Sequence, residues 1–224
     1  MQISNGHEHG DVLPVTPFHP VLRIIARIIS VLFHPLFIPV YVSSFLMFST
    51  PLFTGLDGRD KLFLLIRFLL MYTVFPLVTI LLAKGLGFIQ SIYLRTQKDR
   101  IIPYIACGMY YFWMWYVLRN QPQFPKELVM LSLAIFIGSS LGLMANSYLK
   151  VSMHGISMGV MVAFTCIVAF LAEINFGPYI SLSLLIAGLV STARLMNSDH
   201  DPVEVYSGLI IGIVAQVAAY LIVY

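Results

Sequence analysis

A short polar segment near the carboxyl end carries an arginine, a histidine and a carboxylate between two long apolar runs. Arg194 precedes His200 by six residues, and Glu204 follows His200 by four. Residues four apart share one face of a helix, so the Glu204 carboxylate can hold the His200 imidazole in one tautomer. The other ring nitrogen then carries the lone pair of a nucleophile, and a guanidinium can bind phosphate oxygens. The segment therefore predicts chemistry at phosphorus.

The composition identifies the environment of this segment. Of the 224 residues, 59% are hydrophobic and 10% are charged, against about 25% charged in an ordinary soluble domain. Apolar runs close to the roughly 20 residues needed to cross a hydrocarbon core recur along the chain. They cover about 21–50, 62–89, 101–118, 128–146, 155–171, 180–193 and 203–224. We therefore expect an integral, multi-pass membrane protein with an all-α fold, a polytopic bundle of six or seven transmembrane helices.

The first apolar run leaves the number of spans open. Pro35 and Pro39 interrupt it, and proline breaks the hydrogen-bond ladder of a helix. The run opens with two arginines four residues apart on one face, which predicts an interfacial amphipathic helix leading into a span from about Leu36. Residues 1–20 are predicted to be a polar tail, and residues 21–224 a single transmembrane domain.

Residues that could do chemistry gather in three interhelical loops. Two predicted helices separate the first loop from the second, and two more separate the second from the third, so all three return to the same face. The loops are residues 95–103, 150–155 and 194–204. The first holds Lys98 and Arg100, and the second holds Ser152 and His154. The loops on the other face have no histidine, so the predicted chemistry is confined to one side of the membrane.

The second and third loops resemble signature motifs of the type 2 phosphatidic acid phosphatase superfamily, whose members dephosphorylate lipid phosphates and whose relatives include vanadate haloperoxidases. The family's second motif is Pro-Ser-Gly-His, and the similar segment Val-Ser-Met-His keeps Ser152 and His154 at the same spacing. The third motif is Ser-Arg, five residues, His, three residues and Asp. Arg194, His200 and Glu204 follow this spacing, with glutamate in place of aspartate.

The first motif departs further from the family. The family has Lys, six residues and Arg-Pro, whereas Lys98 and Arg100 are two residues apart and Pro103 comes three later. They match by order along the chain and by residue type, not by spacing, and Arg95 is a competing phosphate ligand. The resemblance covers about residues 95–208 and is to a divergent, bacterial-type member.

The resemblance implies a metal-independent lipid phosphatase with a phosphohistidine intermediate and no cofactor. His200 would attack phosphorus with Glu204 bonded to its other ring nitrogen, and His154 would protonate the leaving oxygen and later activate water. The phosphate-binding residues would be Lys98, Arg100, Ser152 and Arg194. The substrate would be phosphatidate, phosphatidylglycerol phosphate or a polyprenyl diphosphate, among the lipids of a bacterial inner (plasma) membrane.

Other functions stay open. A lipid-binding or scaffolding protein on the same fold is favoured by the altered first motif and by Glu204. A transporter is opposed by the scarcity of charge inside the spans, where Arg67 and Glu173 are the exceptions. Single cations could bind lipid headgroups, and residues 199–201 could bind a divalent ion. The net charge of +3 gives no reason to expect nucleic acid as a partner, and the oligomeric state is left open.

Overall fold

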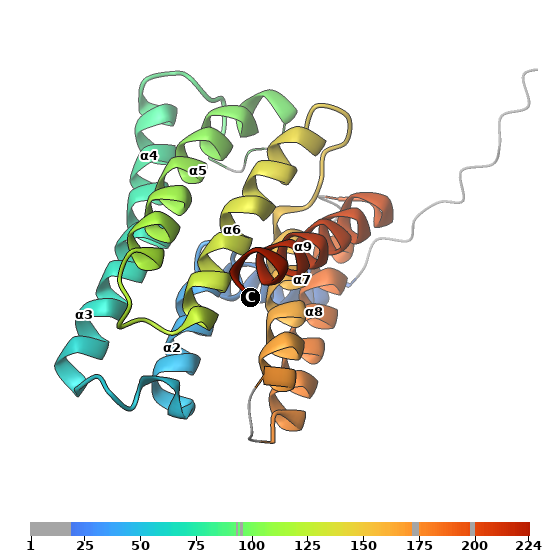
Figure 1. The fold of residues 1–224 in the computed structure, drawn as a ribbon. Coiled ribbons are helices and arrows are strands. Elements are labelled where there is room, and N and C mark those ends of the chain that lie inside the picture. The colour runs from blue at the N-terminus through green and yellow to red at the C-terminus, as the bar shows by residue number, and fades with distance from the viewer. Residues whose placement is uncertain (1–18, 93, 95, 172–174, 198–199) are drawn as a thin grey trace, which may run out of the picture.

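The chain forms an all-α bundle in the computed structural model, which describes residues 19–92, 94, 96–171, 175–197 and 200–224 (Figure 1). Its α-helices are α1 Pro20–Leu32, α2 Ile38–Ser49, α3 Gly58–Leu69, α4 Phe75–Gly85, α5 Gln97–Arg119, α6 Lys126–Ala145, α7 Met153–Leu171, α8 Gly177–Met196 and α9 Pro202–Val223. A 3-10 turn, Pro51–Phe53, follows α2, and a π turn, Leu70–Val74, joins α3 to α4. Apart from its last two residues, the predicted polar tail lies outside the described residues.

Among the described residues, six helical segments are long and apolar enough to cross a membrane, which confirms the expected polytopic fold. They are the continuous stretch Gly58–Gly85 and the helices α5 to α9. The apolar helix α2 has 12 residues. At 1.5 Å per residue it is about 18 Å long, short of the roughly 30 Å hydrocarbon core. Of the two predicted counts, helix length supports six spans.

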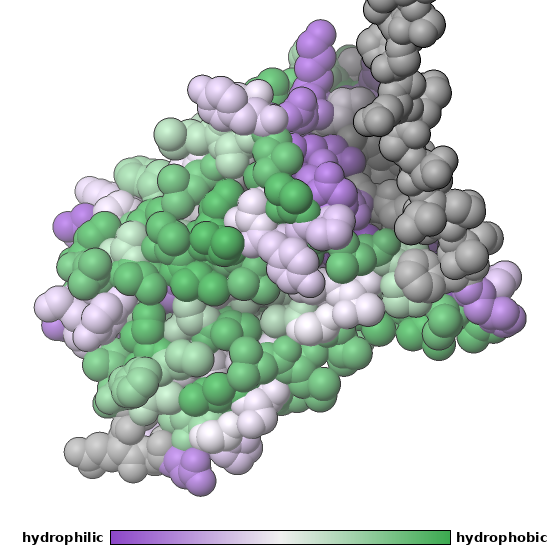
Figure 2. All heavy atoms as spheres, turned by 90° about the vertical axis from the view of Figure 1, so that its right-hand side faces the viewer, coloured by the Kyte–Doolittle hydropathy of each residue, from purple (hydrophilic) through white to green (hydrophobic). Residues whose placement is uncertain are grey.

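Large apolar side chains are exposed along the spans, as a lipid-facing surface requires. Figure 2 shows them as a broad hydrophobic band, with hydrophilic residues gathered near its upper end. The predicted amphipathic helix is α1, which ends at Leu32 just before the His34-Pro35 break. It buries Ala26 and Ser30 against its neighbours while its large aliphatic side chains stay exposed. It packs mainly on α8.

The tightest helix contact in the bundle joins α7 to α9. Each of these helices has two glycines four residues apart, namely Gly155 and Gly159 on α7, and Gly208 and Gly212 on α9. A Cβ atom on Gly159 would lie 2.1 Å from the carbonyl oxygen of Leu209, and one on Gly212 would lie 2.1 Å from that of Ile156. No side chain larger than hydrogen fits there, so the two backbones touch, as at other small-residue contacts in membranes.

Hydrogen bonds hold the three predicted loops together at one end of the bundle. The side chain of Asn146, after α6, donates to the carbonyl oxygen of Gln97 at 2.9 Å. Arg100 of α5 donates through Nη1 to the carbonyl oxygen of Val151 at 2.7 Å. The main-chain N–H of Ser152 donates to the carbonyl oxygen of Glu204 at 2.9 Å. The predicted convergence of these loops on one face is confirmed.

The glycine contact predicts that alanine lowers stability at Gly212 and does not lower it at Gly108. Gly212→Ala should lower the thermal unfolding midpoint in detergent, since overpacking of this kind costs about 1–3 kcal/mol. Gly108→Ala on α5 is the control, because a Cβ there meets nothing within 4 Å. It should be neutral or stabilising by up to about 1 kcal/mol. Equal changes in the unfolding midpoint from the two substitutions would show that the α7–α9 contact does not limit the stability of the protein.

Candidate active site

The start of α9 places His200 against Glu204. Asp201 caps the helix, since its Oδ1 accepts from the main-chain N–H of Glu204 at 2.8 Å, and Pro202 occupies the first turn. His200 Nδ1 lies 2.5 Å from Glu204 Oε2, and the histidine side chain is 3% exposed. An ionised carboxylate can only accept a hydrogen bond, so Nδ1 carries the proton and Nε2 the lone pair. The contact expected from the spacing is present.

The start of α7 brings His154 to the same end of the bundle. The buried hydroxyl of Ser152 accepts from the main-chain N–H of Gly155 at 3.3 Å, as a helix cap does. His154 Nε2 lies 3.0 Å from the carbonyl oxygen of Ser30 in α1. A carbonyl oxygen only accepts, so Nε2 is the donor and Nδ1 of His154 carries the lone pair. Ser152 thus acts here as a cap, and its predicted role as a phosphate ligand stays a prediction.

A third histidine, His34, joins the cluster from the turn between α1 and α2. Its ring stands edge-on to that of His154, with 5.3 Å between the centroids. Its Nδ1 accepts from the main-chain N–H of Leu36 at 3.3 Å, which leaves the proton of the neutral ring on Nε2. Burial, and then the positive charge of Arg194, lower the pKa of His34 to about 4, so this ring is neutral at pH 7.

The two predicted arginines also reach the cluster. Arg194, in the last turn of α8, acts electrostatically on His34, His154 and Arg100. Arg100 is 5% exposed and also interacts electrostatically with Glu204. Besides its bond to Val151, Arg100 donates through Nε to the carbonyl oxygen of Leu94 at 2.8 Å. Its guanidinium therefore joins the first loop to the second beside the carboxylate.

Two cations change the predicted set of residues around the histidines. Lys98 is exposed, because at about 100° per residue it lies on the side of α5 opposite to Arg100. Lys150, which the motif comparison does not include, has Nζ 3.9 Å from Glu204 Oε2. Arg95 and Asp199 lie outside the described residues. The structure thus gathers Arg100, Arg194 and Lys150 around the histidines, with Lys98 elsewhere.

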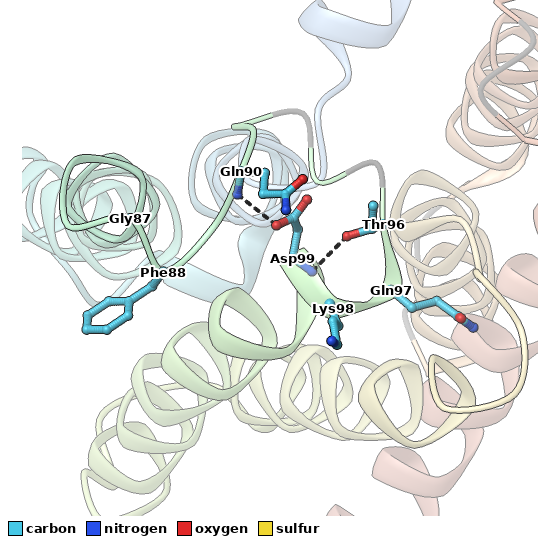
Figure 3. A pocket seen from close by; sticks show the side chains of 7 residues that line it. All are labelled: Gly87, Phe88, Gln90, Thr96, Gln97, Lys98 and Asp99. Atoms are coloured by element: carbon cyan, nitrogen blue, oxygen red, sulfur yellow. Dashed lines mark hydrogen bonds between the residues drawn. The ribbon is translucent and has the colours of Figure 1, made fainter.

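Lys98 instead borders an open depression of about 430 Å³ at the start of α5 (Figure 3). Asp99 lies on the inner side of this depression, where its Oδ1 accepts from the main-chain N–H of Gln90 at 2.8 Å. Its own N–H donates to Thr96 Oγ1 at 3.1 Å. These two hydrogen bonds hold the chain before α5 against the first turn of that helix. A phosphate role for Lys98 stays a prediction without a contact to support it.

No protein-family model, curated protein or solved structure matches the chain. Within the described part of the chain, no three His, Cys, Asp or Glu side chains are grouped so that they could hold a metal ion. The divalent-ion alternative includes Asp199 and is therefore not decided. The resemblance to lipid phosphatases therefore rests on the sequence motifs alone.

Arg100 donates to the carbonyl oxygens of Leu94 and Val151, so its substitution should lower stability more than substitution of Lys98. Arg100→Lys keeps the charge but cannot reach both carbonyl oxygens at once, and a hydrogen bond from a charged group contributes about 1.5–3 kcal/mol. The thermal unfolding midpoint in detergent should fall by several degrees. Lys98→Met is the matched control and should change stability by less than about 0.5 kcal/mol. A larger loss from Lys98→Met would contradict the assignment of these two faces of α5.

Proposed function

We propose that the protein is a metal-independent membrane phosphatase that hydrolyses a lipid phosphate through a phosphohistidine on His200. The contact of 2.5 Å between His200 Nδ1 and Glu204 Oε2 carries the proposal. It supports a neutral imidazole whose Nε2 lone pair is the nucleophile, with a carboxylate ready to stabilise the imidazolium as it forms. The family resemblance further implies the inner membrane of a bacterium as the location.

The cations beside this pair suit a phosphoryl group. In the first step Nε2 of His200 forms a bond to phosphorus while the bond from phosphorus to the lipid oxygen breaks. Arg100 and Arg194 neutralise the phosphoryl oxygens, whose charge must be stabilised throughout the transfer. In the second step water attacks phosphorus, the P–N bond breaks, and inorganic phosphate leaves.

The other two histidines suit proton transfer and orientation. The leaving oxygen of the lipid takes a proton in the first step, and the attacking water gives one up in the second. We assign both transfers to Nδ1 of His154, because Nε2 donates to Ser30. Nδ1 must take up a proton from solvent before the first step; it gives this proton to the leaving oxygen and takes one from the attacking water in the second step. His34, neutral with its proton on Nε2, can donate a hydrogen bond to the substrate without adding charge.

A lipid-phosphate-binding protein without turnover is the second candidate. Two observations favour it: His154 Nε2 is engaged by a main-chain carbonyl, and Lys98 lies apart from the histidines. Such a protein would keep the anion-binding cations but transfer the proton poorly. It would bind a phosphate analogue and release no phosphate.

Phosphate release in the presence of a chelator is the first test. Purified protein in lipid nanodiscs should release inorganic phosphate from a lipid phosphate in EDTA, and His200→Ala should abolish the release. Vanadate should inhibit competitively, because it adopts the five-coordinate shape of the phosphoryl group in transfer. Activity that appears with Mg²⁺ and is absent in EDTA would rule out the mechanism. Vanadate binding without any phosphate release would favour the binding protein.

Substitution of Glu204 tests the orientation of the nucleophile. Glu204→Gln should lower kcat by about two to four orders of magnitude, because the amide permits the wrong tautomer of His200. Glu204→Asp keeps a carboxylate, matches the residue of the family motif, and should retain or raise activity. Both variants should be compared at equal folded fraction, measured by thermal unfolding. An inactive aspartate variant beside an active glutamine variant would refute an orienting role for the carboxylate.

A further inference from the structure

A π turn lies within the long apolar stretch Gly58–Gly85, between α3 and α4. Pro76 follows it in the first turn of α4. Proline has no main-chain N–H, so it cannot donate to the carbonyl oxygen four residues earlier, that of Tyr72. The main-chain N–H of Phe75 instead donates to the carbonyl oxygen of Leu70, five residues back. Single π turns inside α-helices are frequent at functional sites, so the contacts of this one are informative.

The π turn places a buried hydroxyl against the chain just before α2. Thr73 is 5% exposed, and its Oγ1 donates to the carbonyl oxygen of Leu36 at 2.7 Å. The two residues are 37 positions apart, so this hydrogen bond joins segments that no local pattern connects. Another hydroxyl of the same stretch, that of Thr79, lies 3.0 Å from the hydroxyl of Tyr110 on α5. The stretch is therefore tied to α2 through Thr73 and to α5 through Thr79.

Leu36 in turn holds His34. The main-chain N–H of Leu36 donates to Nδ1 of His34 at 3.3 Å. Pro35 stands between them, and its ring locks one of the few backbone torsions that separate the two residues. Fixing the Leu36 carbonyl therefore also restricts the direction of the Leu36 N–H. Since the ring of His34 stands edge-on to that of His154, the hydroxyl of Thr73 is connected to the histidine cluster through one residue.

We propose that Thr73 is a positioning residue for His34, whose hydroxyl holds the backbone of Leu36 so that His34 keeps Nδ1 as acceptor and its proton on Nε2. The inference rests on the proposed function, in which Nε2 of His34 donates to the substrate. It adds a residue outside all three sequence motifs, which acts through Leu36 and not on the substrate itself. Without this hydroxyl the buried carbonyl of Leu36 loses a donor, which is unfavourable, so the turn rearranges and the other tautomer of His34 becomes populated.

The tautomer of His34 is the direct readout, measured at pH 7 by nuclear magnetic resonance of isotope-labelled histidine nitrogens in nanodiscs. The signal of His34 is assigned by its loss in His34→Phe and should show the proton on Nε2. Thr73→Val keeps the shape of the side chain without the hydroxyl and should lower the ratio of the two tautomers at least about threefold. Thr73→Ser restores the donor and should restore the ratio. Thr79→Val is the matched control, since it removes the other hydroxyl contact of this stretch, and it should leave the ratio unchanged.

Vanadate binding shows whether Thr73 acts through His34. Thr73→Val should weaken the binding at least about threefold, and the same substitution in a His34→Phe protein should have no further effect, because the two residues then form one coupled unit. An undiminished loss in the His34→Phe protein, or an unchanged tautomer ratio in Thr73→Val, would overturn the proposal. Thr73→Ala removes the same hydroxyl and replaces the valine variant if that variant does not fold. A shifted tautomer ratio in a protein that releases no phosphate would support the positioning role and contradict the proposed activity alone.

Discussion

The candidate site depends on the direct backbone contact between α7 and α9. Both helices begin at the same end of the bundle and run in the same direction, so packing their glycines together also brings their first turns together. The hydrogen bond from Ser152 N–H to the Glu204 carbonyl oxygen fixes the register of the two starts. His154 and the pair of His200 and Glu204 are carried by these first turns. A side chain in the contact would separate the residues that the chemistry needs close together.

Parallel helix starts also determine which ligand charge the site favours. The N-terminal end of a helix presents unpaired N–H groups and a partial positive charge, which stabilise an anion nearby. The starts of α5, α7 and α9 all lie at this end, and Arg100, Arg194 and Lys150 add full charges. Charged groups buried away from water, such as Arg100, are costly unless they are paired. Glu204 offsets part of this charge, and a phosphate would offset much of the rest.

Local patterns in the sequence are sufficient to predict part of this arrangement. The four-residue spacing of His200 and Glu204 predicts their contact, because helix geometry alone determines it. The length of the apolar runs predicts the spans, and the even number of helices between the loops predicts their convergence. Helix geometry also explains the placement of Lys98, since a residue two positions from Arg100 must face the other way.

Contacts between distant segments could not be predicted in the same way. The sequence presents His34 beside a proline in an apolar run, which indicates a break in a helix and says nothing about what the ring contacts. Its place beside His154 depends on α1 folding back onto α8, a packing with no periodic signal. The same fold explains why Ser30, an unremarkable serine in an amphipathic helix, bonds both His154 and Asn197.

This position of α1 links the membrane-facing surface to the chemistry. Ser30 belongs to α1, whose large aliphatic side chains are mostly exposed, and its carbonyl oxygen determines which nitrogen of His154 carries the proton. The orientation of His154 therefore depends on the packing of α1, whereas the pairing of His200 with Glu204 is made within four residues of the chain and does not involve α1.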